Sequence, residues 1–179
     1  MESEIIQQTE KWIMSVVIDL NFCPFAAKAL LKKSVRYVVL KDVGVKQSLE
    51  ALIQEFEYLS DHEDIETTFI IFANDFVDFK TYLQLVKKAE NTLTKEDYDG
   101  IYQIASFHPD YCFAGSDSDD AANYTNRSIY PMLHVLREDS LTKALALYPS
   151  SELIPEHNIA LARQKGLQYM QTLRAACMD

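Results

Sequence analysis

Hydrophobic residues recur along this chain of 179 residues with two periods, one typical of amphipathic helices and one typical of buried strands. Apolar positions three and four residues apart predict helices at 5–20, 45–59 and 76–93. Short runs of β-branched and aromatic residues predict strands at 35–40, 67–73 and 101–107. Helices and strands therefore alternate over the first part of the chain.

Outside this alternating part the pattern favours helices. Pro24 suits the first turn of a short helix at 24–33, which would place Cys23 at the N-cap. Three further helices are predicted after a long loop, at 131–138, at 141–147 and from Pro155 onward. We therefore expect the C-terminal part of the chain to be helical.

Strands that alternate with helices of this length are the signature of β-α-β crossovers, which bring strands together in parallel. The run at 67–73 is apolar throughout, as expected of a central strand that is covered on both faces. The sequence thus predicts an α/β fold: a small, at least partly parallel three-stranded sheet packed with helices, plus a helical C-terminal part. A chain of 179 residues can bury its own core, so we expect residues 1–179 to form a single globular domain.

Charge and composition narrow the classes of partner. The chain has 27 acidic and 17 basic residues and a net charge of −10, which argues against binding to nucleic acid or to an anionic membrane surface. Its four glycines do not form a Gly-rich loop of the kind that cradles phosphate groups. No secretory signal or membrane span is predicted, and three cysteines without C-x-x-C spacing fit reduced thiols, so we expect a cytoplasmic protein.

The candidate site begins where the predicted strands end, because ligands of open parallel sheets bind beyond the carboxyl ends of the strands. His108 follows the third strand and opens a loop at 108–130, which is long enough to suggest a function. With an ordinary pKa of about 6.5, its side chain is suited to act as an acid, a base or a ligand. Alternatively, His108 simply caps the end of the strand.

Cys23 is a second candidate, since a thiolate at a helix N-terminus faces unpaired N–H groups and the positive end of the helix dipole. That effect is worth only about 0.3–1 kcal/mol, which is too little to ionise a thiol with a pKa of about 8.5. A catalytic Cys23 therefore needs a cation beside it. Without one, Cys23 is a packing residue between Phe22 and Phe25.

Polar side chains gather in the second half of the loop and just beyond it. Asn123, Asn126 and Arg127 offer amide and guanidinium groups that suit the orientation of a carboxylate or a phosphate. Alternatively, they form a polar turn that satisfies its own backbone. His134 and Arg137 are three residues apart and share one face of the predicted helix that follows.

Several of these residues lie on segments that are distinctive as a set. The segments are 21–26 (N-F-C-P-F-A), 106–111 (S-F-H-P-D-Y), 113–115 (F-A-G), 123–128 (N-Y-T-N-R-S), 130–138 (Y-P-M-L-H-V-L-R-E) and 154–159 (I-P-E-H-N-I). Together they resemble the bacterial family catalogued as domain of unknown function 1415, a name that brings no activity with it. The resemblance implies that the candidate side chains lie on signature segments of that family: Cys23, His108, Asn123, Asn126, Arg127, His134 and Arg137.

Our first hypothesis is an enzyme or a binder of a small anionic metabolite, with a pocket at the carboxyl edge of the sheet. The substrate-binding candidates are Asn123, Asn126, Arg127 and Arg137. The catalytic candidates are Cys23, His108 and His134. This hypothesis requires the two histidines and the two arginines to converge on one cavity.

Two other hypotheses remain open. One is a mononuclear metal-dependent enzyme, in which Cys23, His108 and His134 are three ligands that leave a fourth position open. The other is a non-enzymatic interaction domain, whose partner surface is formed by the loop aromatics Tyr111, Phe113, Tyr124 and Tyr130. The sequence identifies no cofactor, substrate or oligomeric state.

Overall fold

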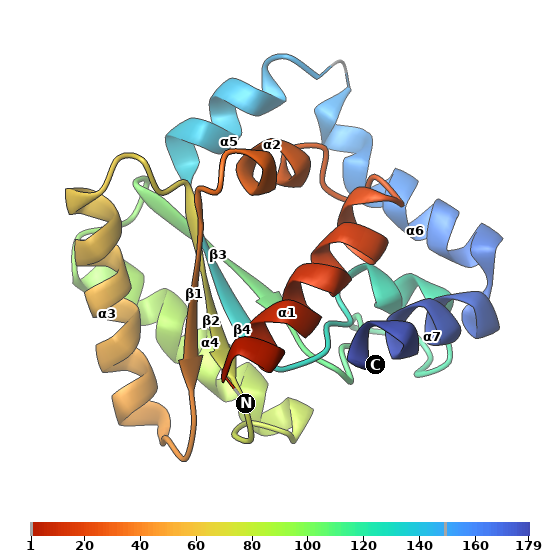
Figure 1. The fold of residues 1–179 in the computed structure, drawn as a ribbon, viewed down its shortest axis with the longest axis horizontal. Helices are drawn as coiled ribbons and strands as arrows, with labels where there is room; N and C mark the ends of the chain where they lie inside the picture. Colours follow the sequence, from red (N-terminus) through yellow and green to blue (C-terminus); the bar gives the residue numbers. More distant parts are fainter. Residues whose placement is uncertain (1, 149) are drawn as a thin grey trace.

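The computed structural model describes residues 2–148 and 150–179, and within them it contains a four-stranded sheet (Figure 1). The strands lie in the order β1-β2-β4-β3. Their bounds are β1 Val35–Leu40, β2 Thr67–Phe72, β3 Tyr102–Phe107 and β4 Met132–Arg137. β1 and β2 pair in parallel, whereas β4 runs antiparallel to both β2 and β3. The strands β1, β2 and β3 therefore point in the same direction.

The α/β class, the partly parallel sheet and the helical C-terminal part are confirmed, but the count of three strands is corrected to four. The helix predicted at 131–138 is wrong, because this segment forms β4, which lies between β2 and β3. Met132, Leu133, Val135 and Leu136 are apolar without strict alternation, since a central strand is covered on both faces. A short apolar run of this kind fits a helix and a strand equally well.

The helices agree with the other predictions except at their ends and at Gly166, whose φ of 86° divides the single helix predicted from Pro155 onward into two. The α-helices of the described residues are α1 Glu2–Trp12, α2 Ala26–Leu31, α3 Val45–Asp61, α4 Phe79–Lys95, α5 Glu138–Leu145, α6 Ile154–Lys165 and α7 Leu167–Ala175. A π-helical segment η1 (Ile13–Ile18) continues α1, and short 3-10 segments are η2 Ala121–Thr125, η3 Ser151–Leu153 and η4 Ala176–Met178. Phe25 is the N-cap of α2, so the predicted position of Cys23 at that N-cap is wrong.

α3 and α4 cover one face of the sheet (Figure 1). The residues that make this side of the core include Leu52, Phe56, Ile70, Phe72, Leu85, Leu133 and Val135. The hydroxyl of Tyr82 on α4 donates to the Met132 carbonyl at 2.8 Å and accepts from the Phe107 N–H at 3.0 Å. α4 therefore also joins the end of β3 to the start of β4.

α1 and η1 lie on the opposite face of the sheet, and α6 and α7 pack against η1 and η2 (Figure 1). The indole of Trp12 lies edge-on against Phe107, with 5.3 Å between the ring centroids. Its Nε1 donates to the Arg127 carbonyl at 3.1 Å. Trp12 thus connects the first helix to both the end of β3 and the loop that follows.

The connection from β3 to β4 is an ordered loop that contains η2. Its two ends are joined where the His108 N–H donates to the Asn126 carbonyl at 3.2 Å. α6 packs directly on η2, which holds the loop between this helix and the edge of the sheet. Among the described residues, the helices are all too short or too polar to cross a membrane.

Candidate functional site

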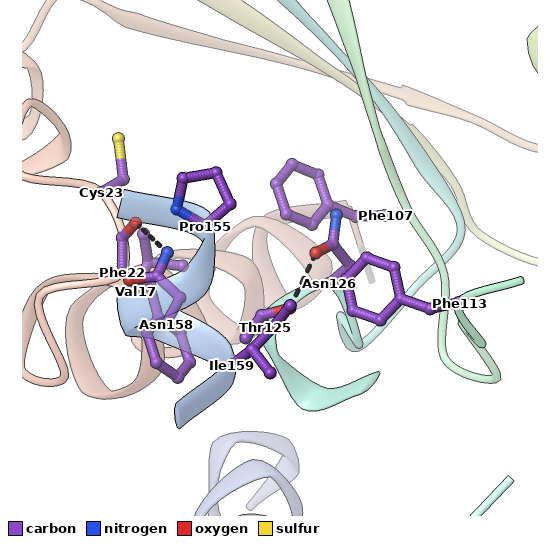
Figure 2. Close-up of a pocket in the computed structure, with 10 residues that line it drawn as sticks. All are labelled: Val17, Phe22, Cys23, Phe107, Phe113, Thr125, Asn126, Pro155, Asn158 and Ile159. Carbon is purple, nitrogen blue, oxygen red and sulfur yellow. Dashed lines mark hydrogen bonds between the residues drawn. The ribbon is translucent and has the colours of Figure 1, made fainter. Parts of the chain in front are cut away.

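A pocket of about 260 Å³ opens where the end of η1, the end of β3, the loop around η2 and the start of α6 meet (Figure 2). It is lined by Val17, Phe22, Cys23, Phe107, Phe113, Thr125, Asn126, Pro155, Asn158 and Ile159. Figure 2 shows the side chains from α6 on one side and Phe107, Phe113 and Asn126 on the other. The pocket therefore lies between segments that are far apart in the sequence.

The wall next to η1 follows from the way this helix ends. Asn21 has a φ of 54°, in the left-handed region that Asn enters more readily than most residues. The chain turns there, and the Phe22 N–H donates back to the Val17 carbonyl at 2.8 Å. The Phe22 carbonyl accepts from Asn158 Nδ2 at 2.7 Å, which ties the turn to α6. Single-turn π-helical segments such as η1 are frequent at functional sites.

The wall formed by the loop is fixed by Asn126. Its Nδ2 donates to the Ser106 carbonyl at 3.3 Å, and its Oδ1 accepts from the Thr125 hydroxyl at 2.9 Å. These bonds hold the end of η2 against the end of β3. They therefore keep Phe107 in place at the wall of the pocket.

None of the ten lining residues carries a charge, and most of them are apolar. The hydrogen-bonding side chains are those of Cys23, Thr125, Asn126 and Asn158. Asn158 Oδ1 makes no hydrogen bond to any residue that the structure describes, whereas its Nδ2 is bound to Phe22. This oxygen is available to accept a hydrogen bond from a ligand.

Cys23 lies at one end of the pocket, with its sulfur pointing away from Asn126 (Figure 2). Burial raises the pKa of the thiol above its ordinary value, although the N–H groups of Phe25 and Ala26 act in the opposite direction. The pocket lining contains no Lys, Arg or His side chain beside it. The cation that a catalytic thiolate needs is therefore missing from this wall, and Cys23 is a protonated thiol at neutral pH.

His108 lies at the end of β3, as predicted, but it is fully buried and does not line the pocket. Its Nε2 lies 3.0 Å from the Phe76 carbonyl, and its Nδ1 accepts from the Asp110 N–H at 2.9 Å. A carbonyl only accepts, so Nε2 carries the proton. Burial lowers the pKa of His108, so the ring is neutral. Both ring nitrogens hold the loop, which matches the alternative of a strand cap, and a catalytic role stays a prediction.

His134 and Arg137 point to opposite faces of the sheet, because successive side chains alternate along a strand. The prediction that these two side chains share one face is therefore wrong. The His134 ring stacks on Phe69 with 3.8 Å between centroids, and its Nε2 lies 2.6 Å from the Thr67 hydroxyl. Burial among these groups lowers the pKa of His134 to about 3. Arg137 donates to the carbonyls of Leu59 and His62 at the C-terminal end of α3, and to the Ile65 carbonyl in the connection to β2.

Asn123 and Arg127 hold the loop together. The buried Asn123 accepts from the Phe113 N–H at 3.0 Å through Oδ1 and donates to the Asp117 carbonyl at 2.9 Å through Nδ2. Arg127 donates through Nε to the Tyr111 carbonyl at 2.9 Å and through Nη2 to the Ser118 carbonyl at 2.8 Å. These contacts match the alternative interpretation, a polar segment that satisfies its own backbone.

The expected convergence of the two histidines and two arginines on one cavity is wrong. Of the candidate side chains, Cys23 and Asn126 line the pocket. Because β4 is a strand and not a helix, His134 lies in the middle of the sheet. Arg137 pairs with the first residue of β3, so it lies at the edge opposite His108.

The two other hypotheses gain no support from the geometry. Within the described residues, no group of three His, Cys, Asp or Glu side chains is placed to hold a metal ion. Tyr124 is buried, and Tyr111, Phe113 and Tyr130 are partly buried. These aromatics pack the loop down onto the molecule and do not form a broad exposed surface.

The comparisons with known proteins bear on this pocket. A family model described as "Protein of unknown function (DUF1415)" matches residues 4–172. The chain belongs to the DUF1415 family. Neither a curated protein nor a solved structure matches it. Nine of the ten lining residues, all except Val17, lie on segments that carried the resemblance to DUF1415.

Sequence reasoning missed most of the wall of this DUF1415 pocket. Phe107 and Ile159 are ordinary apolar residues, and only the fold shows that they face a pocket. Asn158 did have a signal, because it is a polar residue on the distinctive segment 154–159. Its importance depends on the bond to the Phe22 carbonyl, and no feature of the sequence predicts that contact.

Proposed function

We propose that this DUF1415 protein binds a small, mainly uncharged molecule in the pocket between Phe107 and Asn158. The observation that carries the proposal is that nine of the ten lining residues lie on the segments that resemble the family. These segments meet at an open pocket, whereas segments that serve packing alone meet in a closed core. Mainly apolar pockets with a few polar groups that fix orientation are typical ligand sites.

The lining favours a ligand with a flat apolar part and a hydrogen-bond donor. Phe107 and Phe113 offer ring surfaces for the apolar part (Figure 2). Asn158 Oδ1 accepts the hydrogen bond. A carboxylate or phosphate finds no cationic side chain among the lining residues, so this pocket does not favour the anionic metabolite of our first hypothesis. The protonated thiol of Cys23 favours binding over nucleophilic catalysis.

We also expect the protein to work in the cytoplasm. Cys23, Cys112 and Cys177 are free cysteines, as thiols are in a reducing compartment. This expectation stays a prediction, and fractionation of cells that express the protein is its test.

Benzamide and benzoate test the proposal as a matched pair, because they share the ring and differ in charge. Each is titrated into uniformly ¹⁵N-labelled protein, and the backbone amide resonances are followed by NMR. We expect benzamide to shift the resonances of Phe113, Asn126 and Asn158, with a dissociation constant in the millimolar range that is common for fragments. Benzoate should bind more weakly, since its carboxylate cannot donate to Asn158 Oδ1.

Two tryptophan variants provide the control. Ile159→Trp fills the pocket and should abolish the benzamide shifts. Leu153→Trp adds the same side chain at an exposed position of η3 that does not line the pocket, and it should leave them unchanged. Benzamide shifts that persist in Ile159→Trp, or a tighter binding of benzoate than of benzamide, would contradict the proposal.

A further inference from the structure

Two arginine side chains lie beside the segment 124–128, outside the pocket described above. Arg127 is held by the carbonyls of Tyr111 and Ser118, and its Cζ lies 4.9 Å from the centroid of the Tyr124 ring. Arg174, on α7, donates through Nε to the Ser128 carbonyl at 2.7 Å. Main-chain oxygens thus fix both guanidinium groups, and the Ser128 carbonyl that holds Arg174 belongs to the residue that follows Arg127.

Neither arginine forms an ion pair with a carboxylate of the residues that the structure describes. The ion pairs found among the described residues do not include Arg127 or Arg174, although the chain has 27 acidic residues. By contrast, Arg163 pairs with Asp120 at 2.6 Å. Both residues are partly buried, so an anion that binds here interacts with the two charges more strongly than it would with fully solvated arginines.

The effects of neighbouring groups on the pKa of Arg174 also favour an anion beside these two arginines. Burial lowers the pKa of Arg174, and the nearby positive charge of Arg127 lowers it further. Tyr124, Cys177 and the exposed carboxylate of Asp110 act in the opposite direction. His108, which also senses Arg174, is neutral. The charged groups that act on one another here are therefore two cations and one exposed carboxylate, which leaves a local positive excess.

We infer that Arg127 and Arg174 form a binding site for a phosphate-type oxyanion. The terminal nitrogens of Arg174 and Nη1 of Arg127 make no hydrogen bond to any residue that the structure describes. They are the donors that remain for the ligand. Planar guanidinium groups match the oxygens of phosphate in pairs, so two of them provide several charge-assisted hydrogen bonds.

This site is independent of the proposed pocket. Neither Arg127 nor Arg174 lines that pocket, so binding of benzamide and binding of phosphate can fail separately. Arg127 belongs to both the predicted anion site and this one, whereas Arg174 takes the place that was predicted for Arg137. α7 brings Arg174 to the segment 124–128, and no pattern in the sequence indicated this contact.

The test is a titration of ¹⁵N-labelled protein with inorganic phosphate, with the arginine Nε–Hε resonances followed by NMR. Ionic strength is held constant with sodium chloride, so that general screening does not mimic binding. We expect the resonances of Arg127 and Arg174 to shift together. Phenyl phosphate is titrated in parallel: binding of both ligands assigns the site to a phosphoryl group carried by a metabolite, and binding of inorganic phosphate alone assigns it to free phosphate.

Three variants decide the outcome. Arg174→Gln should raise the dissociation constant for phosphate by about tenfold or more, which corresponds to about 1.4 kcal/mol. Arg163→Gln removes the same charge from an ion-paired arginine and should leave binding unchanged. Asp110→Asn removes the one nearby carboxylate and should tighten binding. Equal weakening in Arg174→Gln and Arg163→Gln, or unchanged binding in both Arg174→Gln and Asp110→Asn, would overturn the inference.

Discussion

Both faces of the sheet bury apolar side chains, but the loop and the helices on one of them are also fixed by polar side chains. Between the sheet and the helices α3 and α4, apolar side chains such as Leu52, Phe72 and Leu133 are completely buried. On the other side, the loop from β3 to β4 and the helices α6 and α7 are held by polar side chains that bond to main-chain groups: Asn123, Asn126, Arg127, Asn158 and Arg174. The pocket lies on this second side.

This difference explains why several catalytic and substrate-binding candidates instead hold the backbone in place. A long loop contains many backbone groups that need partners and few apolar side chains to offset the entropy of ordering. His108, Asn123 and Arg127 supply those partners. Ligand binding is therefore expected from the groups whose hydrogen-bonding capacity remains unused, such as Asn158 Oδ1 and the ends of the Arg174 guanidinium.

The largest loss of stability is expected between the sheet and the helices α3 and α4. Phe72→Ala removes a completely buried ring that packs with the α3 and α4 side chains, so the free energy of unfolding should fall by about 3–5 kcal/mol. Urea denaturation measures this loss. The pocket on the opposite face should keep its affinity for benzamide. A loss below about 1 kcal/mol would show that Phe72 does not pack as a core residue.

A smaller loss of stability is expected in the loop from β3 to β4. Asn123→Ala leaves the Phe113 N–H and the Asp117 carbonyl without their partner, and it should cost about 1–3 kcal/mol, the range for one unpaired buried group, because these two groups are only partly buried. Hydrogen exchange should become faster at 109–127 and stay unchanged in α3 and α4. Faster exchange spread evenly over the whole chain would contradict the independence of the two sides.

The next effect concerns the end of α3. Arg137→Gln removes the positive charge from two carbonyls at the C-terminal end of that helix and from the Ile65 carbonyl beyond it, and it should cost about 1–2 kcal/mol. Because Arg137 lies far from the pocket, binding of benzamide and of phosphate should be the same as in the wild type. Weaker phosphate binding in this variant would restore Arg137 to the anion site.

The last effect is a dependence of stability on pH. The pKa of His134 is lowered to about 3 in the folded protein, so the unfolded chain binds more protons below its ordinary pKa of about 6.5. The contribution is complete above that value and is lost as the pH falls toward 3. We expect His134→Gln to lose less stability than the wild type between about pH 7 and about pH 5. Parallel curves from urea denaturation would argue against a neutral His134.

Much of the fold was predictable because its signals are local. The strands at 35–40 and 67–72 have clear β-branched runs, and α3 and α4 have long apolar stripes. β4 was not predictable in the same way, because its identity depends on its neighbours. β4 pairs with Thr67 to Ile71 of β2 on one side and with β3 on the other. Only this pairing makes 132–137 a strand.

The site was predictable in part, because some of its residues stand out by residue type alone. The segments that contain Cys23 and Asn126 were singled out by their residue types, and both side chains line the pocket. The roles of His134 and Arg137 depended on the type of element that carries them, and the wrong element placed them wrongly. Arg174 depended on a contact between α7 and the segment 124–128, which lie far apart in the sequence.

The most direct test of ligand binding in this pocket is a crystal structure of the wild-type protein soaked with benzamide. We expect the ring of benzamide to lie between Phe107 and Ile159, with its amide N–H directed at Asn158 Oδ1. The side chains of His108, His134 and Arg137 should keep their bonds to Phe76, Thr67 and the end of α3. Benzamide bound against His134 or Arg137, with nothing between Phe107 and Asn158, would contradict this expectation.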